Sequence, residues 1–266
     1  MTEDGPGPYG APQERRKVRM RSSDDEAARQ LPKRFFKNAS AQPAEEGGYQ
    51  VLLDERAVKT PKREFLVVPT LAYAEAIAAE WNALGDTIDP ARLAFTKLSN
   101  TTIDGVKPRL RDVHDDILRF IGNDLLLYRA ERPEGLVAQQ NAAWDPVLEW
   151  FHETYDAKFK LTAGVMPIEQ SPLAVAKAAS AVADFDAFAL APLHVMTTLT
   201  GSALLTIAHA RDVLSLEAAW AAAHVDEDWQ IAQWGEDAEA AARRGQRLRE
   251  METASRALDL LGRRER

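Results

Sequence analysis

The sequence contains no cysteine. A chain without cysteine cannot form a disulfide, cannot use a thiolate as a nucleophile and cannot build a zinc site from cysteine sulfur. This absence fits a reducing compartment, and it removes thiol chemistry from the functions to be considered.

Long apolar runs are also missing. No uninterrupted stretch approaches the roughly 20 apolar residues of a membrane-spanning helix, so we expect no membrane insertion. Residues 1–32 lack the apolar core of a secretory signal, and their scattered acids are unlike a mitochondrial transit peptide, which predicts a cytoplasmic protein. The same segment starts with glycines and prolines and then alternates charges without apolar periodicity, so we predict a disordered tail over 1–32.

Positive charge is scarce relative to negative charge. The chain has 33 Lys and Arg residues against 41 Asp and Glu residues, a formal net charge of -8. A surface with this balance repels phosphate backbones, so we expect no nucleic-acid partner. The one dense basic run, Arg15 to Arg21, lies within the predicted tail.

Motifs of common enzyme classes are absent from the sequence. It has no P-loop, no glycine-rich dinucleotide motif and no serine nucleophile elbow. His152-Glu153 begins like a zinc-protease helix, but Asp156 stands where the second histidine is required. His114 lies among three aspartates, an arrangement more typical of a solvated helix surface than of a metal site. We therefore predict no catalytic residue, no metal and no cofactor, and these residues leave an enzyme unsupported.

The segment 33–69 alternates short apolar runs with turn-forming residues, the pattern of a small meander of strands. A sheet this small needs a cover for its apolar face. The next segment, a helix from Leu71 to Leu84 that Thr70 can cap, is the natural cover. The predicted strands are Arg34–Lys37, Tyr49–Leu53, Ala57–Lys59 and Phe65–Val68.

After a further predicted strand at Leu93–Leu98, the pattern becomes helical for most of the remaining chain. Pro192 is expected to mark the start of a helix, because proline disrupts a helix interior. The fold class is therefore α+β, with a small antiparallel β-rich N-terminal domain over 33–105 packed with helix, and an all-α C-terminal domain over 106–262. The predicted helices cover about 108–124, 139–155, 171–182, 186–209, 215–223 and 226–243, with a last one reaching Leu261.

The stretch 226–239 combines six acids with two tryptophans in one predicted helix and its continuation. Two interpretations stay open. In the first, this is an ordinary amphipathic helix whose tryptophans are core and whose acids are solvated. In the second, the aromatic side chains and the negative charge form a surface for a protein partner.

Several short motifs, taken together and in order over Lys33 to Gly245, resemble the assembly chaperones that bind the free alpha subunit of F-type ATP synthase. The early marks are Arg34-Phe35 with Lys37, Leu53-Asp54, Val58-Lys59-Thr60-Pro61, Val68-Pro69-Thr70 and Ala78-Ala79-Glu80-Trp81. The later marks are Asn100-Thr101 with Asp104, Asp124 with Tyr128, Gln140 with Trp144-Asp145-Pro146 and Trp150, His194, and Asp226-Glu227 with Gln230 and Trp234-Gly235.

The resemblance implies a chaperone that holds the unassembled alpha subunit of the F(1) sector until the alpha/beta hexamer forms. It also implies a β-rich N-terminal domain, a helical C-terminal domain and no catalysis. Mitochondrial members carry a transit peptide, so this chain looks like a bacterial, cytoplasmic relative that we expect to be monomeric when free. The candidate partner-binding residues are Trp229 and Trp234 as anchors, with Glu236, Asp237 and Glu239 as acidic contacts.

Two other functions remain as alternatives. One is a general helical adaptor that binds peptides, and the other is a hydrolase that uses Asp226 and Glu227 with a further acid. The turn at Lys59-Thr60-Pro61 is either a second contact point or a hairpin whose threonine and proline set the bend.

Overall fold

The computed structural model describes residues 31–164 and 166–262. Its N-terminal layer is an antiparallel sheet in which β2 (Tyr49–Leu53) lies between its neighbours. β1 (Ala39–Pro43) pairs with β2 along its whole length, while β3 (Arg56–Ala57) and β4 (Val67–Val68) pair with opposite ends of β2. The strand predicted at residues 34–37 is wrong, because the strand begins only at Ala39.

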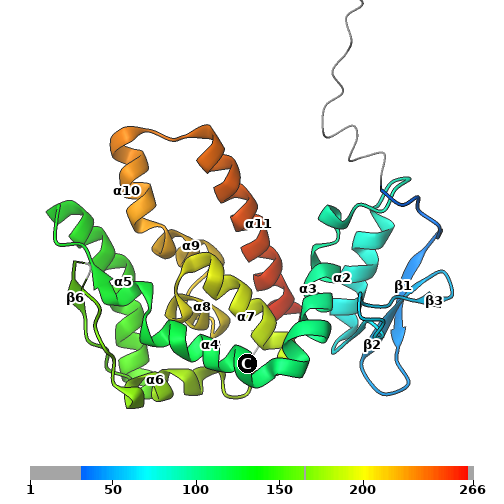
Figure 1. Cartoon of the computed structure of the whole chain (residues 1–266), viewed down its shortest axis with the longest axis horizontal. Helices are drawn as coiled ribbons and strands as arrows, with labels where there is room; N and C mark the ends of the chain where they lie inside the picture. The colour runs from blue at the N-terminus through cyan, green and yellow to red at the C-terminus, as the bar shows by residue number, and fades with distance from the viewer. Residues whose placement is uncertain (1–30, 165, 263–266) are drawn as a thin grey trace, which may run out of the picture.

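Helix α2 (Leu71–Asn82) covers this sheet, as predicted (Figure 1). The Thr70 side chain caps it by accepting a hydrogen bond from the Tyr73 backbone N–H at 3.2 Å. Trp81, 9% exposed, packs in the core beneath the helix, and its indole N–H donates to the Thr96 hydroxyl at 3.0 Å. The expected cover of the sheet is therefore confirmed.

The strand predicted at Leu93–Leu98 is also wrong, since residues Ala94–Thr101 form helix α3 after the short helix η1 (Pro90–Arg92). The cause is a tertiary contact. The Glu80 carboxylate on α2 accepts hydrogen bonds from the backbone N–H groups of Phe95 and Thr96, at 2.6 and 3.0 Å. These are first-turn donors that have no partner within the helix itself.

The remaining chain is helical apart from one short parallel pair, β5 (Tyr128–Arg129) with β6 (Thr162–Ala163). Together with the sheet, this confirms the α+β class. The α-helices are α4 (Leu110–Gly122), α5 (Glu134–Tyr155), α6 (Pro172–Ala179), α7 (Ala187–Thr200), α8 (Ala203–Ala210), α9 (Leu216–Ala223), α10 (Val225–Trp234) and α11 (Ala238–Leu260). The short helical turns are η2 (Thr102–Val106), η3 (Lys107–Arg109), η4 (Leu125–Leu127) and η5 (Ser180–Val182). Of the described helices, none is long and apolar enough to cross a membrane.

Two of the predicted helices are interrupted, and each interruption lies at a glycine with positive φ, while α5 begins at Glu134, five residues before its predicted start. The predicted helix 186–209 ends at Gly201 (φ 71°) and restarts as α8, while Pro192 lies inside α7 instead of starting it. The predicted helix 226–243 ends before Gly235 (φ 88°), after which α11 begins and continues to Leu260. Positive φ is a conformation that glycine adopts without steric cost.

The buried residues form two hydrophobic clusters, one under the sheet and one among the helices. Helix α11 contributes to both, with Met251 in the helical cluster and Ala257 in the sheet cluster. The Thr70 hydroxyl donates to the Leu260 carbonyl at 2.6 Å, which fastens the end of α11 to the start of α2. The division at residues 105 and 106 stays a prediction, and the predicted tail lies outside the described residues, except for its last two positions.

Candidate partner-binding surface

Helices α10 and α11 are joined at the top of the view in Figure 1. Four of the five predicted partner-binding residues lie at this join, which we call the tip and define as residues 234–239. Trp234 ends α10, Glu236 and Asp237 form the connection, and Glu239 lies in the first turn of α11. All four are exposed, whereas Trp229, farther down α10, is only partly exposed.

The local sequence explains the shape of the tip. Gly235 has φ 88° and ψ 169°, a combination that is essentially restricted to glycine, and it stops α10. Asp237 then caps α11 by accepting a hydrogen bond from the Ala240 backbone N–H at 2.8 Å. The negative charges of Asp237 and Glu239 at the start of α11 also suit the positive end of the helix dipole.

Trp234 is 87% exposed, the largest exposed fraction among the large hydrophobic side chains described. An indole normally loses most of its water contact on folding, because its apolar area is large. Its exposure therefore provides an aromatic side chain that a partner can bury.

Trp229 has a different environment. Its six-membered ring lies on Gly135 at the start of α5, so closely that a Cβ atom at residue 135 would stand 2.6 Å from Cη2 of the indole. Trp229 thus contributes to the packing of α10 on α5. The structure gives different environments to the two tryptophans, which lie five residues apart on the same helix.

A hollow of about 260 Å³ lies between α10 and α11 beside the tip. Its apolar lining includes Ile231, Ala240 and Ala241, and its acidic lining is Glu227, Glu236 and Asp237. The cation that lines it, Arg244, is already paired with the Asp228 carboxylate. The hydrogen bond to Asp228 is the main cause of a raised pKa of Arg244, and attraction by nearby carboxylates raises this pKa further. Glu239 is paired with Arg243. The hollow therefore carries surplus negative charge.

Polar contacts from α5 hold the first turn of α10 and the last turn of α9. The Gln140 amide donates to the Asp226 carboxylate at 2.6 Å, and its oxygen accepts from the Ala130 N–H at 2.8 Å. The Trp144 indole donates to the Ala222 carbonyl at 2.7 Å. Sequence motifs marked both Gln140 and Asp226 without indicating that they form a hydrogen bond, because the two residues are 86 positions apart along the chain.

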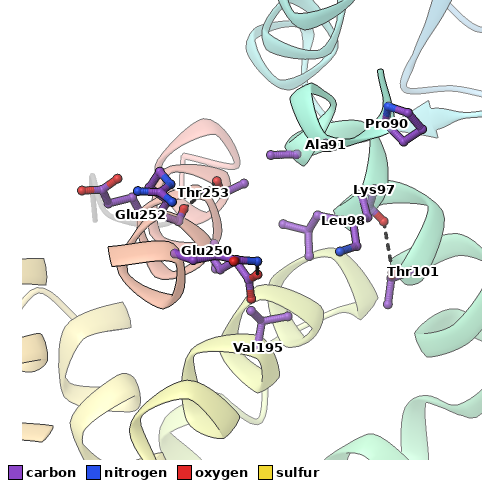
Figure 2. Close-up of a pocket in the computed structure, with 13 residues that line it drawn as sticks. Pro90, Ala91, Lys97, Leu98, Thr101, Val195, Glu250, Glu252 and Thr253 are labelled. Carbon is purple, nitrogen blue, oxygen red and sulfur yellow. Dashed lines mark hydrogen bonds between the residues drawn. The ribbon is translucent and has the colours of Figure 1, made fainter. Parts of the chain in front are cut away.

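A second, larger cleft of about 580 Å³ separates α3 and η1 from α11 (Figure 2). Lys97 and Leu98 line it on the α3 side and Glu250 on the α11 side, while Val195 comes from α7. Its lining carries both signs of charge around apolar side chains. Sequence reasoning missed this cleft, because its walls come from segments that are far apart along the chain.

His194, His209 and His224, and the turn at residues 59–61, form hydrogen bonds within the fold. His194 is bonded to Asp116 at 2.6 Å and buried His209 to Ser255 at 3.0 Å. Burial lowers the pKa of His224, which is bonded to the Trp220 carbonyl at 2.7 Å. In the turn, buried Thr60 donates to the Asp104 carboxylate at 2.7 Å. Within the described part of the chain, no group of three or more His, Asp or Glu side chains is arranged to hold a metal ion.

Comparison with known proteins decides the family. The family model described as ATP12 chaperone protein matches residues 33–152. The structure of the Atu1473 protein, a putative chaperone from Agrobacterium tumefaciens, is 45% identical, with 87% of each chain covered and a TM-score of 0.84. The chain belongs to the ATP12 chaperone family. The resemblance inferred from the sequence motifs is thereby confirmed.

Two further structures extend the ATP12 likeness across the helical part. Atp12 from Paracoccus denitrificans is 38% identical over 86% of this chain and 98% of its own, with a TM-score of 0.82. A mutant of the same Paracoccus protein matches with the same identity and TM-score over 86% of this chain and 97% of its own. The family model stops at residue 152, so the tip lies beyond the residues that it matches.

Proposed function

We propose that this ATP12-family chaperone binds the unassembled alpha subunit of the F(1) sector of F-type ATP synthase and covers its subunit interface until the alpha/beta hexamer forms. An unassembled subunit exposes apolar surface that is destined for its neighbours, and such surface promotes aggregation. A chaperone that covers it keeps the subunit soluble. The family supports the client's identity, and the function requires no catalysis, metal or cofactor.

The observation that carries the proposal is the exposed indole of Trp234 beside a hollow with surplus negative charge. Protein interfaces concentrate their binding energy in a few aromatic or arginine residues surrounded by a polar rim. In the proposed site Trp234 is the anchor, and Glu236, Asp237 and Glu239 form the acidic rim. Trp229 is included in the proposed site because it lies on the same helix as Trp234, directly below the tip.

Co-expression with the alpha subunit of the same organism tests the function. We expect the alpha subunit to become soluble and to co-elute with the chaperone in size-exclusion chromatography, and the complex to disappear when the beta subunit is added. An alpha subunit that still aggregates without forming a complex would contradict the proposal. The free chaperone should elute as a monomer and fractionate with the bacterial cytoplasm.

Substitutions at the tip test the site. Trp234→Ala should raise the Kd for the alpha subunit about 30-fold, the effect of losing an anchor worth about 2 kcal/mol. Glu236→Lys should also weaken binding, because it reverses a charge in the rim. Titration of labelled alpha subunit measures both constants. Leu173→Ala and Glu46→Lys are matched controls, since both residues are exposed and lie outside the tip.

Asp237 needs a different substitution, because it caps α11. Lysine at this position would remove the cap at a cost of about 1 kcal/mol, so weaker binding could arise from local unfolding. Asp237→Ser removes the charge and keeps a capping oxygen. Unchanged Kd values for the serine variant, Trp234→Ala and Glu236→Lys would together place the client elsewhere on the surface.

The adaptor and hydrolase alternatives predict different results. An adaptor would capture unrelated unfolded or peptide clients with affinities similar to that for the alpha subunit. A hydrolase would lose turnover on Asp226→Asn while its fold and its partner binding persist. Asp226 accepts a hydrogen bond from Gln140, a contact that gives this carboxylate a structural task.

A further inference from the structure

Gly135 lies in the first turn of α5, where its own backbone gives no reason for a glycine. It is exposed, and it is not among the described glycines with positive φ. Glycine within a helix costs about 1 kcal/mol relative to alanine. The reason for glycine at this position must therefore come from outside the helix.

The neighbouring element that requires glycine is α10. An alanine Cβ at residue 135 would lie 2.6 Å from Cη2 and 3.1 Å from Cζ3 of the Trp229 indole, well inside van der Waals contact. The absence of a side chain therefore lets the ring rest directly on the backbone of α5. Any larger residue must displace the indole ring from the backbone of α5.

Along α10, the Trp229 contact lies nearer to the tip than the two polar contacts of this helix do. The Gln140–Asp226 hydrogen bond holds the first turn of α10, and the Asp228–Arg244 ion pair links α10 to α11. Trp234 follows Trp229 by five residues, about 7.5 Å along the helix axis. A small tilt of α10 about its anchored first turn would therefore shift Trp234.

We infer that Gly135 and Trp229 form a positioning contact that sets the direction of α10 and thereby the place at which Trp234 is presented to the client. This inference rests on the proposed function. Trp229 acts on binding through α5 and does not touch the client. Gly135, outside the tip and without a side chain, is thereby a determinant of client affinity.

The test compares Gly135→Ala, Trp229→Ala and the double variant. We expect Gly135→Ala to raise the Kd for the alpha subunit about tenfold and to speed amide hydrogen exchange in residues 225–234. Its melting temperature checks that the fold persists. Gly245→Ala is the matched control, since the nearest atom to its added methyl lies 3.6 Å away, an ordinary contact.

The double variant separates positioning from direct contact. If both residues act through one contact, the Kd of the double variant will not exceed the larger of the two Kd values of the single variants. Additive losses in binding free energy would mean that Trp229 touches the client, and would overturn the inference. Unchanged exchange in α10 on Gly135→Ala would overturn it as well. If the wild-type chain binds no alpha subunit, the proposed function fails, while the exchange data still decide whether Gly135 positions α10.

Discussion

Asp124 is fully buried at the junction of two helical segments, and its carboxylate links them. One oxygen accepts hydrogen bonds from the Ser202 hydroxyl at 2.6 Å and the Leu126 N–H at 3.1 Å, and the other accepts from the Leu204 N–H at 3.0 Å. Burial raises the pKa of Asp124 from 3.8 to about 6, in spite of these hydrogen bonds. A structural acid in the core is therefore expected to titrate under mildly acidic conditions.

This titration predicts a pH dependence of stability. An acid whose pKa is higher in the folded state binds more protons when folded, so its contribution to stability is largest at low pH and is lost as pH rises through about 6. We expect the free energy of unfolding of the wild type, relative to Asp124→Asn, to be about 2 kcal/mol larger near pH 4.5 than near pH 7. Urea unfolding at the two pH values measures this difference.

The comparison with Asp124→Asn matters because other carboxyl groups give the stability a pH dependence of the opposite sign at lower pH. Hydrogen bonds to the Asn38 and Lys37 backbone lower the pKa of Asp54, and a hydrogen bond from His194 lowers that of Asp116. These groups favour folding at higher pH, the opposite sign, and they remain in the variant. An unchanged difference between wild type and variant across pH would show that Asp124 stays charged in the folded protein.

Among the secondary-structure elements, the end of α10 at Gly235 determines the shape of the tip. Gly235 adopts a conformation that other residues reach only at a cost of about 1 to 3 kcal/mol. We expect Gly235→Ala to destabilise the connection between α10 and α11 and to raise the Kd for the alpha subunit at least about tenfold, because Trp234 is the adjacent residue. Hydrogen exchange and a binding titration measure the two effects.

Gly47 supplies the control for this prediction. It lies in the turn between β1 and β2 with a similar positive φ, 93°, and nothing crowds its Cβ position. Gly47→Ala should therefore cost stability without changing the Kd. Equal Kd values for Gly235→Ala and Gly47→Ala would show that client binding does not depend on the conformation of the tip.

Helix α11 contributes to both hydrophobic clusters and thereby connects the two parts of the molecule. Met251 is fully buried in the helical cluster, and the fully buried Ala257 two turns later lies under the sheet. Because α11 contributes buried residues to both clusters, unfolding of the helical part also removes packing contacts from the sheet cluster. The described chain should therefore unfold in one cooperative transition, even though the motifs and the composition divide it into two parts.

Met251→Ala tests this coupling. Removing a buried methionine side chain should lower the free energy of unfolding by about 2 to 5 kcal/mol. We expect hydrogen exchange to rise both in α8, within the helical cluster, and in β2, within the sheet. Protection that falls in α8 but persists in β2 would mean that the two parts unfold independently.

Local sequence was sufficient where neighbouring residues satisfy one another. Thr70 caps α2 and Asp186 caps α7 through hydrogen bonds to backbone groups three residues away, so both helix starts could be read from the chain. The α+β class, the cover of the sheet by α2 and the ATP12 family likewise followed from patterns and motifs. These features depend on short-range geometry or on ordered motifs, which a sequence displays directly.

The tertiary structure decided what depends on contacts between distant residues. Glu80 makes residues 94–101 helical by binding their first N–H groups, and Gly135 places Trp229 against α5 while Trp234 stays exposed. The two tryptophans are chemically identical and lie on the same helix, so the sequence by itself determined that α10 carries aromatic and acidic groups. Only the position of α5 decided which indole packs and which faces solvent, because burial is a property of neighbours in space.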